Sequence, residues 1–455
     1  MTKILVIGGG PGGYVAAIRA AQLGADVTLV EKDRLGGTCL NVGCIPTKAL
    51  LHSAELFEEA RKAGLINADV KADFGKVQAR KETIVKQLVG GVRGLLSANK
   101  IRVINGAAVF TGKNTAAVNG ETIPFEKAII ATGSLPASVP IPGVNLPPCI
   151  DSTGALSLQS VPQSMVVIGG GVIGVEMATV YAALGCKITI VEMLEEILPP
   201  LDREMTGLVR AQLVKKGIVI KTGAKVLSVA EDKTGAAVTI EQDGKQEAVS
   251  GEKVLVCVGR KSNTADLALD AAGIAADRGR VTVNNKQETN VPGVYAVGDC
   301  TGGSMLAHVA MTQGEIAAEN AMGHSAVYDG RTNPSCVYTS PEAAGVGLTE
   351  EQAKKQNLDY KTGKFPLAAN GKNLVMGGEG MVKIIAGKRY GEVLGLHIVG
   401  PRATDLIGVG ALAIRLEATL DELISTIYAH PTIGESLREA ALAAEGRAVH
   451  IPPGR

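Results

Sequence analysis

The chain has 455 residues, which is enough for three or four domains with sizeable cores. Its 46 Lys and Arg residues balance 45 Asp and Glu residues, so no basic surplus favours nucleic acid or an anionic membrane surface. No apolar run is long enough to span a bilayer. We therefore expect a cytoplasmic α/β protein without a nucleic-acid or membrane partner.

The N-terminus has the pattern of a dinucleotide-binding unit. A buried strand, a glycine-rich turn, an Ala-rich helix and a second strand follow one another and end in an acid (residues 4–7, 8–13, 15–23 and 25–30, then Glu31). Gly8, Gly10 and Gly13 permit close approach of the backbone to a pyrophosphate at the helix N-terminus. Glu31 is placed to bind ribose hydroxyls.

A cysteine pair follows in residues 36–48. Cys39 and Cys44 lie five positions apart in a stretch that reads as a loop entering a helix, with Pro46 in its first turn. The helix dipole at Cys44 favours its thiolate. No further Cys or His lies nearby at ligand spacing, so we expect no metal site. The pair is suited to thiol–disulfide exchange.

The dinucleotide pattern then recurs. A second strand–turn–helix–strand run carries Gly169, Gly171 and Gly174 and ends at Glu192, and first glycine and acid are 23 positions apart in both copies. Two such units around a redox pair indicate flavin plus nicotinamide, with electrons passing between nicotinamide, flavin and disulfide. Glu192 would repel a 2′-phosphate, and residues 193–196 contain no Arg to bind one, which favours NAD over NADP.

The C-terminal part changes character from about Ser335. It reads as mixed strands and helices, with strands at 380–385 and 393–399 and a broad apolar helix over 403–420. A His-Pro-Thr turn then places His430 five residues before Glu435 at the start of a helix. A histidine oriented by a carboxylate is the equipment of a general base for thiol chemistry.

Together, the cysteine segment, both glycine fingerprints and the His-Pro-Thr turn resemble the pyridine-nucleotide disulfide oxidoreductases over essentially the whole chain. The resemblance implies an α/β fold with two Rossmann-like dinucleotide-binding domains, a central domain and an α+β C-terminal dimerisation domain. The expected divisions are 1–148 for FAD, 149–270 for NAD, 271–334 for the central domain that completes the FAD site, and 335–455 for the homodimer interface.

The same resemblance implies roles for single residues. Cys39 is similar to the thiol that exchanges with substrate and Cys44 to the thiolate that lies against the flavin, with Lys48 paired to Glu176 near flavin N5. His430 and Glu435 are expected to act from the partner subunit, with a cis bond before Pro431.

Further residues match the family's cofactor sites. Thr132, Gly133, Asp299 and the helix start at Ala307 correspond to positions around FAD, and Gly259 corresponds to one at NAD. The family pattern has Pro where Ser262 stands, a difference that we expect to affect only loop stiffness. The remaining cysteines are interpreted as buried or inert thiols (Cys149, Cys186, Cys257, Cys300 and Cys336).

Within the family the chain looks like the dihydrolipoamide dehydrogenases. That resemblance implies oxidation of a dihydrolipoyl group, carried by a separate lipoylated protein of a 2-oxo acid dehydrogenase or the glycine cleavage system, with FAD and NAD. One alternative is a related NAD(P)H-dependent reductase of another low-mass disulfide. Another is a redox-sensing subunit whose flavin does not turn over, but such a subunit would lose Cys39, Cys44 or His430.

Overall fold

The first fingerprint lies in a five-stranded parallel sheet of the order β20-β7-β1-β2-β3 in the computed structural model, which describes residues 1–67 and 70–452. Strand β1 is buried in the middle of this sheet, as its continuous apolar sequence requires. The elements of this part are β1 (Lys3–Ile7), α1 (Pro11–Gln22), β2 (Asp26–Glu31), α2 (Gly37–Val42), α3 (Cys44–Lys62), α4 (Phe74–Ala98), β3 (Arg102–Asn105), β4 (Ala108–Gly112), β5 (Thr115–Val118), β6 (Glu121–Pro124), β7 (Lys127–Ile130) and β8 (Ser134–Pro136).

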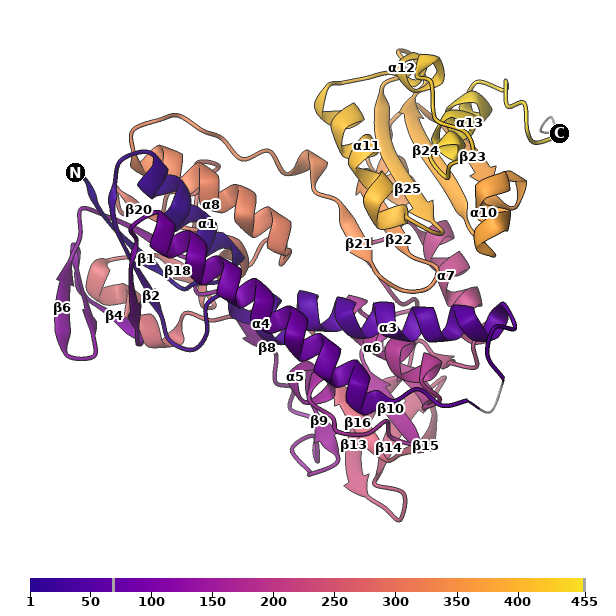
Figure 1. The fold of residues 1–455 in the computed structure, drawn as a ribbon, viewed down its shortest axis with the longest axis horizontal. Coiled ribbons are helices and arrows are strands. Elements are labelled where there is room, and N and C mark those ends of the chain that lie inside the picture. The colour runs from indigo at the N-terminus through magenta and orange to yellow at the C-terminus, as the bar shows by residue number, and fades with distance from the viewer. Residues whose placement is uncertain (68–69, 453–455) are drawn as a thin grey trace.

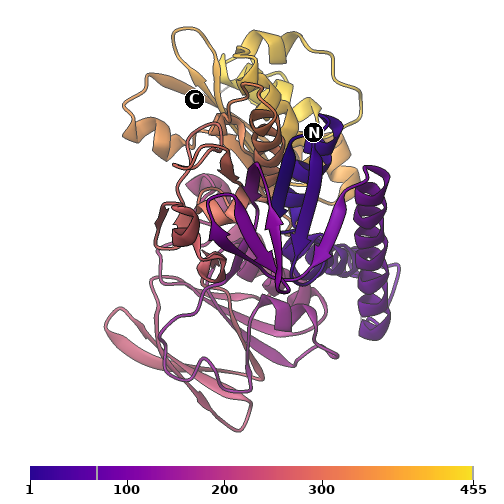
Figure 2. The ribbon, with the colours of Figure 1, turned by 90° about the vertical axis from the view of Figure 1, so that its left-hand side faces the viewer.

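The second fingerprint lies in another five-stranded parallel sheet, of the order β12-β11-β10-β16-β9. Its β10-α6-β11 unit repeats the β1-α1-β2 unit, and the antiparallel sheet β13-β14-β15 extends below it in Figures 1 and 2. The elements here are β9 (Cys149–Ile150), α5 (Ser152–Leu156), β10 (Ser164–Ile168), α6 (Val172–Ala183), β11 (Lys187–Val191), α7 (Arg203–Lys215), β12 (Val219–Lys221), β13 (Lys225–Glu231), β14 (Ala236–Gln242), β15 (Lys245–Gly251), β16 (Lys253–Val256) and β17 (Arg260–Ser262).

The chain then returns to the first unit. Strand β20 joins the edge of the first sheet beside β7, and α8 packs along α1 (Figure 1). The elements of this return are β18 (Ala276–Asp277), β19 (Arg280–Val281), β20 (Val294–Ala296) and α8 (Ala307–Ala321), with short 3₁₀ turns at Ala265–Leu267, Leu269–Ala272, Gly298–Thr301 and Gly330–Thr332. A segment far along the sequence therefore completes the first dinucleotide site.

The C-terminal part is an antiparallel sheet of the order β21-β22-β25-β24-β23, covered by helices (Figure 1). Its elements are β21 (Ser335–Val337), β22 (Ala343–Gly347), α9 (Glu350–Lys355), β23 (Tyr360–Pro366), α10 (Gly371–Met376), β24 (Met381–Gly387), β25 (Val393–Val399), α11 (Ala403–Arg415), α12 (Leu420–Ser425) and α13 (Glu435–Ala444), with a 3₁₀ turn at Leu367–Ala369. The expected α/β architecture with two Rossmann units and an α+β C-terminal part is confirmed.

Two local expectations are corrected. The expected helix over 403–420 ends at Arg415, because Glu417 takes a left-handed φ of 54° and Thr419 caps a separate helix, α12, with Glu422 in a capping box. The segment before Cys44 is also helical rather than a loop. Cys39 lies in the short helix α2, and Gly43 separates α2 from α3.

Helix α3 carries the cysteine segment across to the second unit. Leu50 and Leu51 of α3 share a hydrophobic core with Val175 and Tyr181 of α6 and with the second parallel sheet. Figure 1 shows α3 and α4 running from the first unit over the second. The core thus fixes the distance between the cysteine pair and the second fingerprint.

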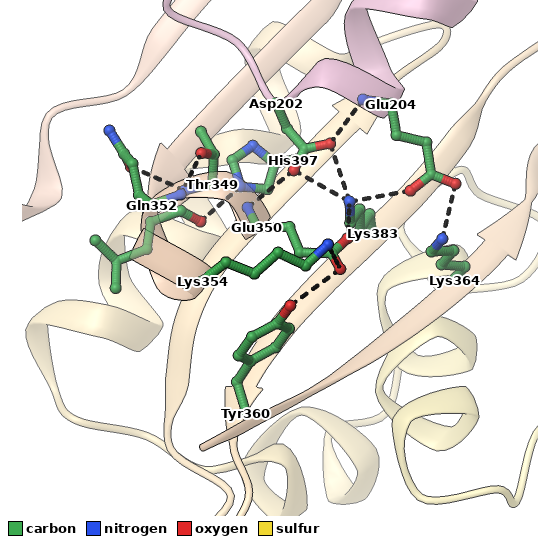
Figure 3. A network of polar contacts seen from close by, with 11 residues as sticks. Asp202, Glu204, Thr349, Glu350, Gln352, Lys354, Tyr360, Lys364, Lys383 and His397 are labelled. Carbon is green, nitrogen blue, oxygen red and sulfur yellow. Dashed lines mark hydrogen bonds and ion pairs between the residues drawn. The ribbon is translucent and has the colours of Figure 1, made fainter. Parts of the chain in front are cut away.

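A buried ionic network joins α7 of the second unit to the C-terminal sheet (Figure 3). The Lys383 ammonium on β24 is 1% exposed and lies 3.0 Å from Asp202, 3.0 Å from Glu204 and 2.7 Å from Glu350. Asp202 also caps α7 and accepts the backbone N–H of Glu350. Three carboxylates therefore surround one cation where these two parts of the molecule meet.

None of the helices in the described ranges is both long and apolar enough to cross a bilayer.

Candidate active site

A single cavity of about 1310 Å³ connects both glycine fingerprints with the cysteine pair. Most of the residues singled out in the sequence line it: Gly8, Gly10, Glu31, Cys39, Cys44, Lys48, Thr132, Gly133, Gly169, Gly171, Glu176, Glu192, Gly259, Asp299 and Ala307. Gly13, Gly174, His430 and Glu435 do not line it. The cavity is large enough for more than one extended ligand, since drug-sized sites occupy about 300–1,000 Å³.

The first glycine loop is built for close backbone packing. Gly8 has a left-handed φ of 104°, and a Cβ on Gly13 would lie 1.8 Å from the carbonyl oxygen of Gly8. Gly13 therefore seats α1 against the turn, while Gly10 opens the helix towards the cavity. The Glu31 carboxylate accepts the N–H of Gly9 at 2.6 Å and that of Asp33 at 2.8 Å. The Glu31 carboxylate is thus held at the cavity wall, where it can accept further hydrogen bonds from hydroxyl groups.

The second glycine loop repeats this geometry. Gly169 has a φ of 110°, and a Cβ on Gly174 would lie 2.2 Å from the Gly169 carbonyl oxygen. The Glu192 carboxylate accepts the N–H of Gly170 at 2.6 Å and that of Leu194 at 2.8 Å. The nearest arginines behind it are engaged elsewhere, since Arg210 pairs with Glu196 and Arg203 with Glu195. The acid is therefore fixed where an adenosine ribose would lie.

The wall around Thr132 and Asp299 fits a flavin nucleotide. The Thr132 hydroxyl is buried in the wall and has no hydrogen-bond partner within the described residues. The Asp299 carboxylate accepts the hydroxyl of Ser134, which in turn is bound by Arg260. An unpartnered buried hydroxyl is costly, so this wall is complete only when a ligand supplies the missing partner. The residues present therefore fit the cofactor that the sequence indicates.

Ser262 forms a specific hydrogen bond and does not only affect loop stiffness. Its hydroxyl donates a hydrogen bond of 2.8 Å to the backbone carbonyl of Asp299, and Asn263 donates to the carbonyl of Thr132 at 3.2 Å. A proline at position 262 could not make the first of these bonds. Ser262, which stands where the family pattern has Pro, thus links strand β17 to the cavity wall at Asp299.

The cysteine pair sits at the junction of α2 and α3 as two free thiols. Hydrogen bonding from Cys39 lowers the pKa of Cys44 to about 7, against the effect of burial, and the charge of Lys48 lowers it further. The same hydrogen bond, together with burial, raises the pKa of Cys39. Cys44 also occupies the first turn of α3, where backbone N–H groups favour a thiolate. The two sulfurs are therefore unlike: Cys44 is the thiolate and Cys39 the thiol.

Lys48 and Glu176 form an ion pair beside the thiols. The Lys48 ammonium lies 2.8 Å and 3.0 Å from the two carboxylate oxygens of Glu176, which is 3% exposed on α6. The backbone N–H of Tyr338 donates to the same carboxylate at 3.0 Å, and the ammonium sits 4.3 Å from the centre of the Tyr338 ring. The sequence reading missed Tyr338, because strand β21 reaches this site only through the tertiary fold.

Helix α8 directs its N-terminus at the cavity. Met305, Leu306 and Ala307 line the wall, and no side chain caps the first turn. Its free backbone N–H groups therefore favour negative charge in the cavity. His308 also lines the wall, and its Nε2 donates to the Pro334 carbonyl at 3.0 Å. Burial lowers the pKa of His308.

His430 and Glu435 form a dyad outside the cavity of their own chain. His430 Nδ1 lies 2.9 Å from Glu435, the backbone N–H of Thr432 binds the other carboxylate oxygen, and the His430–Pro431 bond is cis. Burial would raise the pKa of Glu435, but the Thr432 and His430 hydrogen bonds hold it below its usual range. The His430 side chain is 80% exposed. The dyad thus has a formed geometry and a solvent-facing Nε2.

Of the other cysteines, Cys186 and Cys300 are buried, whereas Cys149, Cys257 and Cys336 are partly exposed free thiols. Burial raises the pKa of Cys186, Cys257 and Cys300 to about 12 and that of Cys336 to about 11, while Cys149 is raised less. Cys257 and Cys336 also line the cavity, which the sequence did not indicate. Within the described residues, no three His, Cys, Asp or Glu side chains are grouped to hold a metal ion.

Comparisons with known proteins identify the family of the chain. Residues 2–314 match the pyridine nucleotide-disulphide oxidoreductase family, and residues 333–441 match that family's dimerisation domain. The dihydrolipoyl dehydrogenase of Geobacillus stearothermophilus is 45% identical over 460 residues, covering 99% of this chain and 97% of that protein. The Thermus scotoductus enzyme of the same name is 46% identical over 457 residues, covering 98% of each.

Two solved structures share the fold over nearly their whole length. LpdA from Mycobacterium tuberculosis has a TM-score of 0.89 at 29% identity and covers 97% of this chain and 99% of its own. The HOCl-induced flavoprotein disulfide reductase RclA from Escherichia coli has a TM-score of 0.87 at 30% identity and covers 96% and 99%.

Proposed function

The chain belongs to the pyridine nucleotide-disulphide oxidoreductase family, and we propose that it oxidises a dihydrolipoyl group to the cyclic disulfide while reducing NAD through FAD. One observation carries this proposal: the activated Cys44 and its partner Cys39 line the same cavity as both dinucleotide loops. Electrons can therefore pass from a dithiol to a nicotinamide without leaving one enclosed space.

FAD and NAD would have different roles in the electron transfer. Bound FAD would supply the two-electron chemistry that links the reduced cysteines to NAD. The first glycine loop, Thr132 and Asp299 would hold FAD, and the second loop with Glu192 would hold NAD. Lys48 would lie on the cavity wall between the two, with its charge balanced by Glu176. Removing either partner would leave a charge uncompensated in this wall.

The chain's own residues handle the thiol protons. His430 of the partner subunit takes the proton of one substrate thiol, whose sulfur then attacks Cys39 in the enzyme disulfide and releases Cys44 as thiolate. The second substrate sulfur displaces Cys39, closing the substrate disulfide and leaving Cys39 as a thiol. The dipole of α3 and the charge of Lys48 stabilise the Cys44 thiolate that results.

The proposal extends to partner, location and domain division. A separate lipoylated protein, the acyltransferase of a 2-oxo acid dehydrogenase or the H protein of glycine cleavage, would present the dithiol to a homodimer. A disulfide that cycles with a nicotinamide is a catalytic pair of the reducing cytoplasm, which supports a cytoplasmic location. We also propose that the chain divides into four domains, at residues 1–148, 149–270, 271–334 and 335–455.

The test is a steady-state assay of purified, FAD-loaded protein with free dihydrolipoamide and NAD. We expect NADH formation that is lost in Cys39→Ser and Cys44→Ser. The alternative reductase is tested in parallel with NADH or NADPH and low-mass disulfides such as oxidised glutathione. Turnover of such a disulfide without turnover of dihydrolipoamide or lipoamide would overturn the proposed substrate.

A further inference from the structure

Helix α13 holds a second histidine–carboxylate pair one turn after the first. Glu439 follows Glu435 by four residues, so both carboxylates lie on the same face of the helix. His450 Nδ1 lies 3.0 Å from Glu439 Oε1, and Glu439 Oε2 accepts the backbone N–H groups of Val449 and His450 at 3.1 Å each. The chain segment after α13 therefore folds back and places its histidine beside the helix.

The two pairs have the same hydrogen-bond pattern. In each, one carboxylate oxygen holds the imidazole Nδ1 and the other accepts backbone N–H. In each, the histidine side chain is exposed, at 80% for His430 and 66% for His450, whereas Glu435 is 31% exposed and Glu439 is buried at 6%. Such a pair fixes the orientation of the imidazole ring.

The two pairs are also coupled through charge. Burial would raise the pKa of Glu439, but its hydrogen bonds from His450 and Val449 hold it below the usual range. The charge of His450 lowers the pKa of Glu435 as well. The other charged groups at this face are Arg438, 3.8 Å from Glu439, and the Lys361–Glu445 pair. His450, when protonated, therefore balances the charge of Glu439 next to the dyad.

We propose that His450 and Glu439 form a second dyad that sets the protonation of the His430–Glu435 dyad, which makes His450 a positioning residue. The inference rests on the proposed function, in which His430 accepts the substrate proton. Without His450, Glu439 keeps only Arg438, at 3.8 Å, as a cationic partner, and its charge, one helical turn from Glu435, stabilises protonated His430. His430 then stays protonated, and so cannot accept the substrate proton, up to a higher pH.

The test follows His430 directly by NMR in the FAD-loaded protein with ring-labelled histidine. Replacement of His430 and His450 in turn assigns two of the six histidine signals. In His450→Gln we expect the midpoint pH of the His430 titration to rise by about 0.5 unit, the order of magnitude for the loss of one nearby unit charge in a water-exposed setting. Glu439 keeps both backbone hydrogen bonds in this variant, so the segment stays anchored.

Two further variants decide the cause. His450→Lys restores the positive charge without an imidazole and should return the midpoint to the parent value or below. His324→Gln removes an exposed histidine after α8 and should leave it unchanged. An equal midpoint in His450→Gln and the parent would overturn the inference, as would an equal shift in His324→Gln.

The acid limb of kcat/KM for dihydrolipoamide should move with the NMR midpoint in the same variants. An unshifted limb beside a shifted NMR midpoint would also overturn the positioning role. Absence of all dihydrolipoamide turnover would instead overturn the proposed function, and the NMR titration would still decide whether the two dyads are coupled.

Discussion

At the scale of single residues, function rests on an asymmetry between two identical side chains. Cys39 and Cys44 differ because α3 begins at Cys44, Lys48 lies one turn further on, and the hydrogen bond between the thiols has a direction. The thiolate is therefore favoured at Cys44, and we propose Cys39 as the thiol that exchanges with substrate.

This asymmetry predicts different spectra for two serine variants. After two-electron reduction, the FAD-loaded Cys39→Ser protein should retain a long-wavelength thiolate–flavin absorption band, because Cys44 remains the donor. Cys44→Ser should lose the band. Absorption spectra of anaerobically titrated variants check this, and the opposite pattern would mean that the two roles are exchanged.

The band should also depend on pH. The pKa of Cys44 lies at about 7, so the band of the reduced protein should be half developed near that pH and fade below it. Lys48→Met removes a charge that favours the thiolate and leaves Glu176 without its cation, so the midpoint should rise by about 1 pH unit or more. A spectrophotometric pH titration measures both, and an unmoved midpoint in Lys48→Met would contradict the electrostatic account.

We propose that Glu192 decides the choice between NAD and NADP. Its carboxylate is fixed by two backbone N–H groups and faces the place of the adenosine ribose, where a doubly charged 2′-phosphate would be repelled. At about 4 Å in water this repulsion amounts to about 2 kcal/mol, or a factor of about 30. We expect NAD to exceed NADP in kcat/KM by at least that factor. Glu192→Gln should narrow the gap, and comparable constants in the parent would refute the assignment.

At the scale of elements, the parts of the molecule are joined by contacts between segments distant in sequence. Lys383 of β24 reaches the start of α7 and the start of α9 at once (Figure 3). Hydrogen bonding with Lys383 lowers the pKa of Glu350 to about 2, against the effect of burial. A carboxylate with a depressed pKa stabilises the fold above its unfolded pKa of about 4.3, and this contribution is lost as pH falls from there towards 2.

Removal of the cation should therefore weaken the fold strongly. Lys383→Met leaves three carboxylates around an apolar group and should lower the free energy of unfolding by about 3–5 kcal/mol. Lys388→Met, which breaks the exposed pair with Asp359 just beyond the same strand, should cost less than about 1 kcal/mol. Urea unfolding of both variants at pH 7 provides the comparison. Equal losses would mean that the buried network adds nothing beyond a surface ion pair.

The same network predicts the pH dependence of stability. Between about pH 4.5 and pH 2 the parent should lose stability more steeply than Lys383→Met, whose Glu350 titrates closer to its ordinary range. Urea midpoints at several pH values in this window measure the two slopes. Parallel slopes would contradict the role of Lys383 in holding the Glu350 carboxylate ionised.

At the scale of the whole molecule, the His430–Glu435 pair and the cysteine pair are separated within one chain. The cavity holds Cys39 and Cys44 but neither His430 nor Glu435, while residues 333–441 match the family's dimerisation domain. A two-fold dimer can bring each dyad to the cavity of the other subunit. The site is then complete only in the assembly.

Mixed dimers test this arrangement. Neither Cys44→Ser nor His430→Ala homodimers should turn over well. If the two variants are unfolded together and reassembled at random in equal amounts, half of the dimers are mixed and each has one intact site of two. Activity should recover to about a quarter of the parent value. Absence of recovery, with subunit exchange shown independently, would place base and disulfide on one chain.

The sequence by itself determined the features that depend on local spacing. Glycine positions, strand ends and the acid 23 residues on specify both dinucleotide loops, because backbone geometry within a single β-α-β unit is a local property. The separation of the thiols and the start of α3 likewise follow from neighbouring residues. The His430–Glu435 pair was readable for the same reason, since a five-residue turn brings the two side chains together.

Only the tertiary structure decided which distant residues complete each site. Tyr338 beside Lys48, Ser262 at the carbonyl of Asp299, and His450 on Glu439 each depend on segments that meet through sheet order and helix packing. Side-chain hydrogen bonds over such separations leave no periodic trace in a single sequence. The boundary between α11 and α12 was missed because a left-handed residue, Glu417, interrupts an apolar pattern that would otherwise continue. Local sequence thus determines the dinucleotide loops, whereas tertiary packing determines which distant residues lie beside them.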